Sequence, residues 1–423
     1  MTARLYVIGA GVAGLAAALA GARRGVEVHL SDAAPQAGGR CRTVAGDFAH
    51  DNGTHVLLSA NLRALAFLDA VGARERWIEP EPDGLPVYDA ATHRLARVGL
   101  SPWSWRDPAR RPPGLALADL PRLLRLALPL PDRTVASLFA GRPIYRSLIE
   151  PLTVAVLNTP GEVASARRLA PALRRIAMPG AARLLVAREG LSADLIGPAV
   201  AALQRQGGTF RAGTRLRAVE DEDGRATVLR FADGAVRLGP EDGVVLALPP
   251  AEVGRLLPGL RVPDAYEPIL NLHYQVALAT TPRFVGLTGT LAQWVLVRGD
   301  HVSVTVSAAG DQAEEAAGSL ATRIWQEVAP ALAALGLDPP AALPPHRVVR
   351  EKRATLRQGL ERVPLPPLRP LANLRLAGDW LTALPATIES AVMSGEAAAA
   401  SLSRRTRSRP ARLLPGRVSA GVG

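Results

Sequence analysis

The sequence predicts an α/β fold built on a parallel sheet, and the N-terminal residues supply the main observations. Residues 5–8 form an apolar run that is typical of a buried strand, and residues 26–30 form a second strand pattern in which apolar residues alternate. A glycine-rich turn between them opens a helical segment. A strand, a helix and a second strand in this order are the β-α-β unit from which parallel sheets are built.

The glycine turn predicts that this unit binds a dinucleotide. Gly9, Gly11 and Gly14 have the spacing G-x-G-x-x-G. In this motif the first glycine makes a tight turn, the second admits the pyrophosphate to the positive end of the helix, and the third lets the helix pack closely on the strand. Asp32 follows the second strand, 18 residues after Gly14, where a carboxylate binds a ribose hydroxyl. The alternative is a tightly packed strand–helix joint that binds no nucleotide.

Length and cysteine content restrict the class of protein. The 423 residues suffice for two domains. The single cysteine, Cys41, excludes a disulfide framework and cysteine-based metal clusters, and it fits a reducing compartment. The first strand follows the N-terminus without a leader pattern, and no run of about 18 uncharged apolar residues is present. We therefore expect a cytoplasmic protein that has no metal site and does not span a membrane.

The charge of the chain is strongly positive. The formal net charge is +12, and Lys352 is the only lysine among the 50 basic residues. The arginines are scattered and aromatic residues make up only 4% of the chain, so no basic-aromatic stripe for nucleic acid is present. Anionic lipid surfaces attract arginine-rich proteins without any fixed motif. We expect a peripheral contact with the inner membrane surface and no nucleic-acid partner.

Three further segments have a recognisable organisation. Gly38, Gly39 and Arg40 suit a phosphate, although a surface turn with solvated arginines is the alternative. Residues 81–131 are rich in proline and include LADLPRLLRLALPLP, which predicts a membrane-interface segment, a cover over an apolar tunnel, or an ordinary core-facing helix. Residues 134–177 read as two or three helices, with Thr159 and Pro160 expected to open the last one.

The second half of the chain predicts strands followed by helices. Residues 209–238 contain short strands separated by Asp-Gly turns, the last three forming a meander, and residues 268–307 alternate as strands of a second sheet. A helix is expected over 311–335. Residues 374–380 predict another strand that ends in Gly378-Asp379, and a final helix is expected over 385–401.

Several motifs together resemble a known family. The N-terminal unit, Gly38-Gly39-Arg40, Gly378-Asp379 and the helix after it resemble flavin amine oxidases and carotenoid desaturases. Within that superfamily the chain resembles the hydroxysqualene dehydroxylases, also called squalene-associated FAD-dependent desaturases of hopanoid biosynthesis. The resemblance covers residues 3–402, and the segments that carry it are Asp51–Leu58, Ala155–Pro160, Glu351–Thr355 and Leu384–Glu389.

The resemblance implies non-covalent FAD and a discontinuous domain arrangement. Residues 1–80, 188–262 and 365–403 would form a Rossmann-like FAD-binding domain of the flavin amine oxidase type. Residues 81–187 and 263–364 would form an interleaved substrate domain with a mixed sheet and helices. The basic residues 404–423 have no periodicity and are expected to be a disordered tail.

The resemblance also assigns cofactor-binding residues. Val219 would hold the adenine through its backbone, and Asp379 would reach the ribityl chain or the pyrophosphate. Thr387 and Ile388 would direct the positive end of the last helix at the flavin. The complete set that it implies is Gly9, Gly11, Ala13, Gly14, Asp32, Gly38, Gly39, Arg40, Val219, Gly378, Asp379, Thr387 and Ile388.

The activity implied by the family is the reductive dehydroxylation of hydroxysqualene to squalene. Its partners would be the apolar polyprenyl substrate and other enzymes of squalene biosynthesis. His55, after the Asp-Asn-Gly turn, is our first candidate for a catalytic proton donor, and a purely structural histidine is the alternative. Asn271 is the second candidate for the substrate face. A carotenoid desaturase and a non-catalytic carrier of polyprenyl lipid are the alternative functions.

Overall fold

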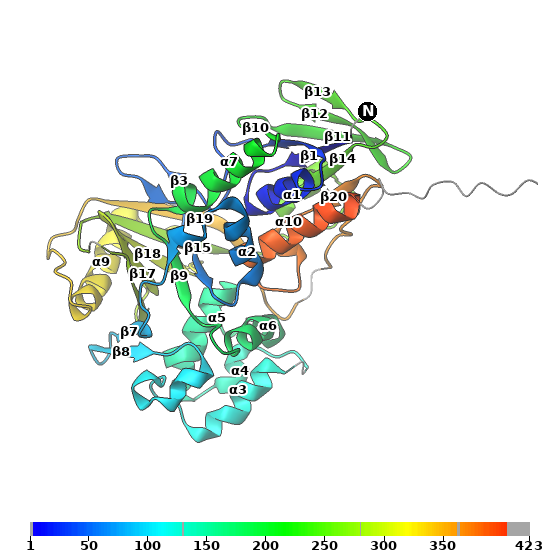
Figure 1. The fold of residues 1–423 in the computed structure, drawn as a ribbon. Coiled ribbons are helices and arrows are strands. Elements are labelled where there is room, and N and C mark those ends of the chain that lie inside the picture. The colour runs from blue at the N-terminus through cyan, green and yellow to red at the C-terminus, as the bar shows by residue number, and fades with distance from the viewer. Residues whose placement is uncertain (1–2, 129–130, 280, 362–363, 404–423) are drawn as a thin grey trace, which may run out of the picture.

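A five-stranded parallel sheet forms the centre of the nucleotide-binding part of the molecule (Figure 1). The computed structural model describes residues 3–128, 131–279, 281–361 and 364–403. In spatial order the strands are β10 (Thr209–Arg211), β2 (Glu27–Ser31), β1 (Arg4–Ile8), β14 (Gly243–Leu246) and β20 (Leu374–Leu376). All four strand pairs are parallel. The beginning, middle and end of the described chain therefore meet in one sheet, which confirms the predicted α/β fold.

Both faces of this sheet are buried, as the continuous apolar runs of its strands require. Leu5 and Val7 face a layer of helices, and Tyr6 and Ile8 face the opposite layer. The helical layer consists of α1 (Val12–Ala22), α2 (Leu62–Val71), α7 (Gly197–Arg205) and α10 (Ile388–Ser403). The opposite layer consists of α8 (Pro250–Leu256) and the antiparallel meander β11 (Leu216–Glu222), β12 (Arg225–Phe231) and β13 (Gly234–Arg237).

The first and last of these helices, α1 and α10, cross at very close range. They lie side by side in Figure 1. A Cβ atom added to Gly395 of α10 would lie only 2.1 Å from the carbonyl oxygen of Ala13 in α1. A side chain at position 395 would therefore push the two helices apart. Glycine at this crossing fixes the C-terminal helix against the helix that follows the glycine turn.

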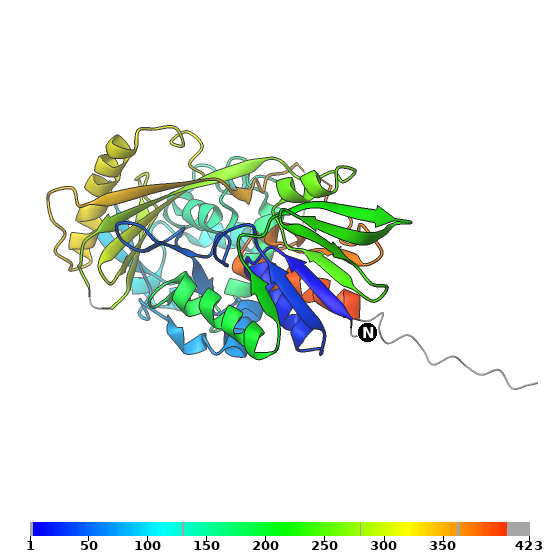
Figure 2. The ribbon, with the colours of Figure 1, turned by 90° about the horizontal axis from the view of Figure 1, so that it is seen from above.

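A second, seven-stranded sheet lies on the other side of the molecule together with α9 (Ala317–Ala334) (Figure 2). One side of this sheet and α9 share a buried apolar core. Its spatial order is β19 (His346–Leu356), β15 (Tyr266–Gln275), β18 (His301–Ser307), β17 (Trp294–Arg298), β16 (Arg283–Thr288), β7 (Leu85–Asp89) and β8 (Arg94–Val98). The expected second sheet is thus present, and it includes four strands, β7, β8, β16 and β19, that were not among the strands expected from the sequence.

Residues 102–176 form a helical region at the lower edge of the molecule in Figure 1. Its α-helices are α3 (Leu120–Ala127), α4 (Val135–Phe139), α5 (Glu150–Leu157) and α6 (Ala166–Ile176), with short helical turns η2 (Pro102–Arg106), η3 (Pro108–Arg110), η4 (Leu117–Asp119) and η5 (Tyr145–Ile149). The expectation that Thr159 and Pro160 open the last helix is wrong. That helix begins at Ala166, because the Ser165 hydroxyl caps it by accepting a hydrogen bond from the amide of Arg168.

Small sheets and turns connect the two halves. β3 (Thr43–Val44) pairs with β4 (His50–Asp51), and β9 (Leu184–Ala187) pairs with β5 (Val56–Leu58) and β6 (Trp77–Ile78). The remaining turns are η1 (Arg74–Arg76), η6 (Ser192–Ile196) and η7 (Asp379–Leu381). The sheet around β9 combines strands from both expected domains, because β5 and β6 lie in residues 1–80 and β9 lies in residues 81–187. The division into two domains stays a prediction.

The helices that the structure describes are too short or too polar to cross a bilayer. The tail expected over residues 404–423 lies outside the described residues.

Candidate active site

The glycine turn after β1 forms the cradle that the sequence predicts. Gly9 has φ +100°, a conformation that favours glycine, and its amide donates to the carbonyl of Ser31 at 2.8 Å. A Cβ atom on Gly14 would lie 1.7 Å from the carbonyl oxygen of Gly9. A Cβ atom on Gly11 would meet no atom within 4 Å. Two glycines therefore hold the turn against the helix, while the third exposes its backbone to open space.

Asp32 fixes the turn from the adjacent strand. One carboxylate oxygen accepts a hydrogen bond from the amide of Ala10 at 2.6 Å, and the other accepts one from the amide of Ala34 at 2.8 Å. Its side chain remains partly exposed at the end of β2. Each carboxylate oxygen retains a lone pair for another donor, so Asp32 is suited to hold a ribose hydroxyl at the edge of the cradle.

The second glycine segment lies directly beside the first. The amide of Gly38 donates to the carbonyl of Ala10 at 2.8 Å, and Gly38 forms a parallel bridge with Gly11. Gly39 follows with φ +56°, and a Cβ atom on it would lie 3.4 Å from the Cα of Gly11. The two segments that were predicted separately thus form one backbone surface, on which Gly11 and Gly39 are partly exposed. The N-terminus of α1, which no side chain caps, points at this surface.

The C-terminal part of the chain completes this surface. Arg40 donates to the carboxylate of Asp379 at 2.8 Å and also to the carbonyl of Ala354. Asp379 is nearly buried, and the preceding amide of Gly378 donates to the hydroxyl of Ser394 at 3.0 Å. Residues 40 and 379 were expected to contact the same cofactor from distant parts of the sequence. The structure brings them together as an ion pair.

The N-terminus of α10 lies next to this pair in sequence and is capped by Thr387. The Thr387 hydroxyl accepts a hydrogen bond from the amide of Ser390 at 3.4 Å, and Ile388, the first residue of the helix, is buried. Glu389 is also buried and accepts hydrogen bonds from the amide of Ala64 at 2.8 Å and from Arg175 of α6 at 3.0 Å. Sequence reasoning missed this role of Glu389, which ties the last helix to the helical region.

Two sequence candidates for catalysis meet around Gly53. A Cβ atom on Gly53 would lie 3.2 Å from the Nδ2 of Asn271 and 3.6 Å from the Cε1 of His55. Asn271 of β15 donates to the carbonyl of Asn52 at 3.3 Å and accepts from the hydroxyl of Thr305 at 3.1 Å. The register of β15 therefore places Asn271 against the Asp-Asn-Gly turn that carries His55.

The surroundings of His55 favour its protonated, cationic form. Its Nδ1 lies 2.9 Å from the carbonyl oxygen of Gly53, as expected for a ring N–H that donates to a carbonyl. Burial alone lowers the pKa of His55, but the Cys41 side chain, the Gly53 carbonyl and the Asp51 carboxylate outweigh it and raise the pKa to about 9. The amide of Cys41 donates to the carbonyl of Gly38 at 2.9 Å, so this cationic imidazole lies close to the glycine cradle.

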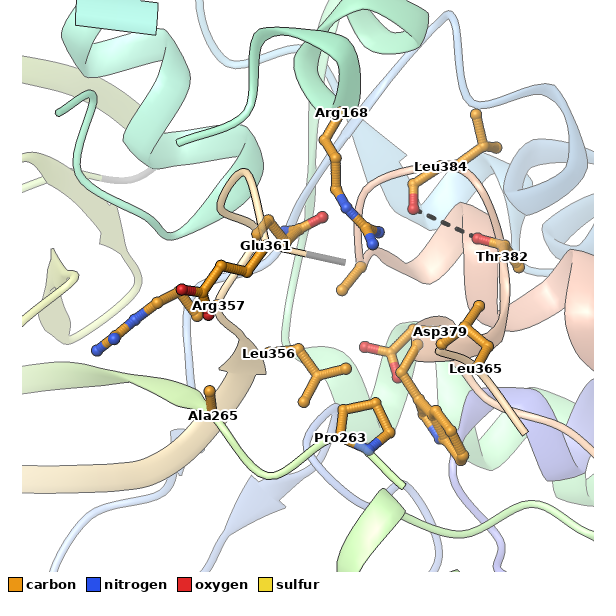
Figure 3. A pocket seen from close by; sticks show the side chains of 13 residues that line it. Arg168, Pro263, Ala265, Leu356, Arg357, Glu361, Leu365, Asp379, Thr382 and Leu384 are labelled. Carbon is orange, nitrogen blue, oxygen red and sulfur yellow. Dashed lines mark hydrogen bonds between the residues drawn. The ribbon is translucent and has the colours of Figure 1, made fainter. Parts of the chain in front are cut away.

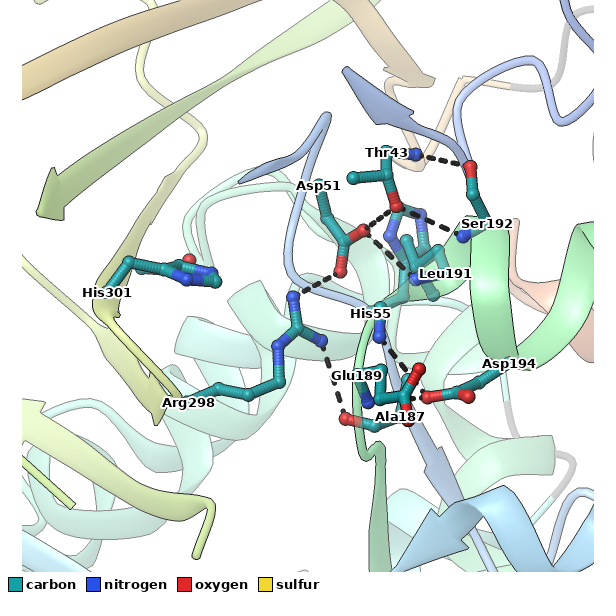
Figure 4. Close-up of polar contacts among 12 residues, drawn as sticks. Thr43, Asp51, His55, Ala187, Glu189, Leu191, Ser192, Asp194, Arg298 and His301 are labelled. Carbon is teal, nitrogen blue, oxygen red and sulfur yellow. Dashed lines mark hydrogen bonds and ion pairs between the residues drawn. The ribbon is translucent and has the colours of Figure 1, made fainter. Parts of the chain in front are cut away.

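A buried ion pair holds the Asp-Asn-Gly turn in place (Figure 4). Asp51 accepts hydrogen bonds from the hydroxyl of Thr43 at 2.8 Å and from the amide of Leu191 at 3.0 Å, and Arg298 of β17 donates to it at 2.7 Å. Arg298 also donates to the carbonyl of Ala187 at 3.4 Å. The network joins β4, η6 and the large sheet, and it fixes the chain immediately before Asn52. The Asp51 motif was noted in the sequence, but its arginine partner was not.

A pocket opens beside Asp379 and the loop that leads to α10 (Figure 3). Arg168 reaches toward it from α6, whereas Arg357 turns away to pair with Glu267. The apolar part of the lining consists of Pro263, Ala265, Leu356, Leu365, Trp380, Leu384 and Ala386. The cradle therefore adjoins a pocket whose wall combines these apolar side chains with charged and polar ones such as Arg168, Glu361 and Gln358.

The exposed glycine backbone, Asp32 and the free helix terminus fit the pyrophosphate and ribose of a dinucleotide. Val219 lies in the meander, in register with Leu229 of β12, and its contact with an adenine stays a prediction. Among the described residues, no group of three or more histidine, cysteine or carboxylate side chains is arranged to hold a metal ion. The arrangement can bind a dinucleotide, present a cationic imidazole beside it and accept an apolar substrate.

Comparison with known proteins shows the family to which the chain belongs. Residues 12–403 match the family described as flavin containing amine oxidoreductase. A hydroxysqualene dehydroxylase from Rhodopseudomonas palustris is 36% identical over 94% of this chain and 98% of its own length. A protein of the same name from Sinorhizobium fredii is 35% identical over 94% of this chain and 98% of its own.

A solved structure has a similar fold. A putative protoporphyrinogen oxidase from Exiguobacterium superimposes with a TM-score of 0.67 and 18% identity, over 96% of this chain and 99% of that chain. The family match and the cradle together define a flavin-dependent oxidoreductase whose cofactor is FAD, as the sequence predicted. The chain belongs to the family of flavin containing amine oxidoreductases and, within it, to the group of hydroxysqualene dehydroxylases.

Proposed function

We propose that this protein converts hydroxysqualene to squalene by reductive dehydroxylation and that His55 donates the proton that the leaving hydroxyl group requires. The names of the similar proteins support the substrate. The single structural observation that carries the proposal is the meeting of His55 and Asn271 at Gly53, next to the glycine cradle.

The proposed reaction requires one proton and one hydride. The hydroxyl group of the substrate lies beside a double bond, so protonation of the oxygen lets water leave and produces an allylic cation. FAD, when bound in its reduced form, supplies the hydride that converts this cation to squalene. The carbon–oxygen bond breaks, a carbon–hydrogen bond forms, and the substrate gains two electrons. The protein must hold the apolar chain, donate the proton and exclude water.

The residues divide into three proposed roles. His55 donates the proton, and Asn271 contacts the substrate beside it through an amide whose orientation Thr305 fixes. The apolar part of the pocket wall excludes water from the cation. The proposed FAD contacts are those assigned from the sequence: Gly9, Gly11, Ala13, Gly14, Asp32, Gly38, Gly39, Arg40, Val219, Gly378, Asp379, Thr387 and Ile388.

An anaerobic assay tests this function directly. Purified protein with chemically reduced FAD is mixed with hydroxysqualene, and the products are identified by mass spectrometry. We expect squalene, and we expect His55→Ala to retain FAD and lose most of the activity. Absence of squalene from wild-type protein with bound, reduced FAD would refute the proposal. A non-catalytic carrier would leave the flavin reduced when substrate is added, which stopped-flow absorbance detects.

We also propose that the protein works in the cytoplasm at a membrane surface, beside other enzymes of squalene biosynthesis. The apolar substrate and product are retained by a bilayer, and the positive charge of the chain favours anionic lipids. Sedimentation of cell extracts tests this placement. Recovery in the membrane fraction at low salt, with release at high salt, is expected for a peripheral protein.

A further inference from the structure

The helical region carries a row of leucines that face away from the protein. Leu117, Leu120, Leu124 and Leu128 are 85%, 47%, 63% and 46% exposed. Their spacing of three and four residues places them along one side of η4 and α3. We call these four residues the leucine stripe. Leu126, on the other side of α3, is buried in the core of the helical region, so the helix is apolar on an inner and an outer side.

Positive charge surrounds the leucine stripe. Arg122 and Arg125 are exposed and lie between its members in sequence. Residues 101–178 contain twelve arginines and only five acidic residues, although they make up less than a fifth of the chain. Trp103, half-exposed, lies under the guanidinium of Arg106 and donates from its ring nitrogen to the carbonyl of Ala177 at 2.7 Å. An exposed apolar row with exposed arginines between its members matches an anionic lipid bilayer.

A groove begins at the end of the leucine stripe. It is lined by Arg125, Leu126, Leu128, Pro131, Arg133, Leu138, Ala166 and Arg167. Arg167 belongs to the first turn of α6, and the next residue, Arg168, lines the pocket beside Asp379. The groove therefore extends from the end of the stripe to the helical turn that also borders the candidate active site. This position suits the transfer of an apolar chain out of the lipid.

We propose that the leucine stripe and its arginines are the surface by which the protein docks on an anionic bilayer, and that the substrate enters from this side. The inference rests on the proposed function for the identity of the substrate, but not for the docking itself. The stripe enters the apolar boundary of the lipid while Arg122 and Arg125 remain at the level of the anionic headgroups. α3 then lies in the plane of the membrane.

Vesicle flotation tests the docking surface. The full chain is mixed with vesicles of phosphatidylcholine, with or without phosphatidylglycerol, and recovery at the top of the gradient is measured. We expect binding to the anionic vesicles that weakens as salt rises. The double variant Leu117→Gln/Leu124→Gln is expected to bind at least about tenfold more weakly. Arg122→Gln/Arg125→Gln should lose the preference for anionic vesicles.

Control variants test whether the leucine stripe, and not another exposed leucine or the basic tail, causes vesicle binding. Leu62 of α2 is 69% exposed and lies outside the helical region, so Leu62→Gln should float like wild type. A chain that ends at Ser403 tests the basic tail. Equal flotation of wild type and the stripe variant, loss of flotation on removal of the tail alone, or no flotation of wild type would each overturn the proposal.

Activity assays with substrate in vesicles and in detergent micelles test whether docking is needed for substrate entry. With substrate in vesicles, the stripe variant should show a raised KM, whereas with substrate in detergent micelles its kcat should equal that of wild type. If the stripe variant and wild type have the same KM with substrate in vesicles, entry from this surface is refuted. If wild type is inactive in both forms, the proposed reaction fails, while the flotation result still decides the docking surface.

Discussion

The Asp51 carboxylate lies 2.7 Å from the guanidinium of Arg298, and both side chains are almost completely removed from solvent. The pair joins the turn that carries His55 to the large sheet. A buried charge that loses its partner is strongly unfavourable, because the remaining charge keeps its full desolvation penalty. The pair therefore offers a direct test of how the two halves of the molecule are held together.

We expect Arg298→Met to lower the free energy of unfolding by about 3–5 kcal/mol, since it leaves Asp51 buried without its countercharge. The surface pair Arg211–Asp233 has the same separation of 2.7 Å but is more than half exposed. Arg211→Met should therefore cost less than about 1 kcal/mol. Urea denaturation of both variants with saturating FAD measures the difference, and equal losses would contradict the assignment.

Cys41→Ala should shift the pH dependence of the reaction. His55 acts as an acid in the proposed mechanism, so activity is lost as pH rises through its pKa of about 9. Because Cys41 contributes to raising that pKa, its removal should move the alkaline loss of kcat to lower pH. A kcat profile measured from pH 6 to 10 with wild type and variant checks this. An unchanged midpoint would show that Cys41 does not affect the catalytic proton.

Two substitutions in the glycine turn test cofactor binding and folding separately. Gly11 has an ordinary φ of −69° and open space in front of it, so Gly11→Val should fold normally but block the pyrophosphate and lower FAD affinity by at least about tenfold. Gly14→Ala would place a methyl group 1.7 Å from a carbonyl oxygen, so it should destabilise the protein without FAD as well. Flavin absorbance and thermal unfolding of the apoprotein distinguish the two effects. Loss of apoprotein stability in Gly11→Val would contradict this prediction.

Buried histidines predict sensitivity to acid. His50, His273 and His301 are buried, and the Nε2 of each has no hydrogen-bond partner among the described residues. Burial lowers the pKa of His273 below its ordinary value of 6.5, and the facing His50, His301, Arg298 and Arg347 lower it further. Burial and Arg298 lower the pKa of His301, partly opposed by the carboxylates of Asp300 and Asp51.

The direction of the pH effect on stability follows from proton linkage. The folded protein keeps His273 and His301 neutral, whereas the unfolded chain takes up protons as pH falls through about 6.5. Stability should therefore be fully present above pH 6.5 and decline below it. His273→Gln should reduce the difference in unfolding free energy between pH 7.5 and pH 5.5, and His93→Gln at an exposed position should leave it unchanged. An identical difference in wild type and His273→Gln would contradict this cause.

Local patterns explain which parts of the fold could be predicted. The β-α-β unit, the meander with its turn at Asp223-Gly224 and the final helix each follow from short-range periodicity and turn residues. β19 was missed because its sequence HRVVREKRATL is rich in charge and lies in a proline-rich stretch. As an edge strand it is only partly buried, so no continuous apolar run marks it.

Only part of the candidate site could be predicted from the sequence, and the reason differs from that for the fold. The cradle glycines and Asp32 are close in sequence and have a known spacing, so their assembly follows from the motif. The contact of Asn271 with Asn52 depends on the register of β15 against β18 and β19, and the pairing of Asp51 with Arg298 spans most of the chain. Such contacts arise from tertiary packing and leave no local pattern.

The crossing of α1 and α10 has a consequence for biosynthesis. The helix at the glycine turn is made at the start of translation, while Gly395 and the capped end of α10 emerge more than 370 residues later. Until then the sheet lacks β20, and Arg40 lacks Asp379. The FAD contacts that we propose at the two ends of the chain can therefore form together only after β20 and α10 have been synthesised. We expect full flavin binding to begin at that point.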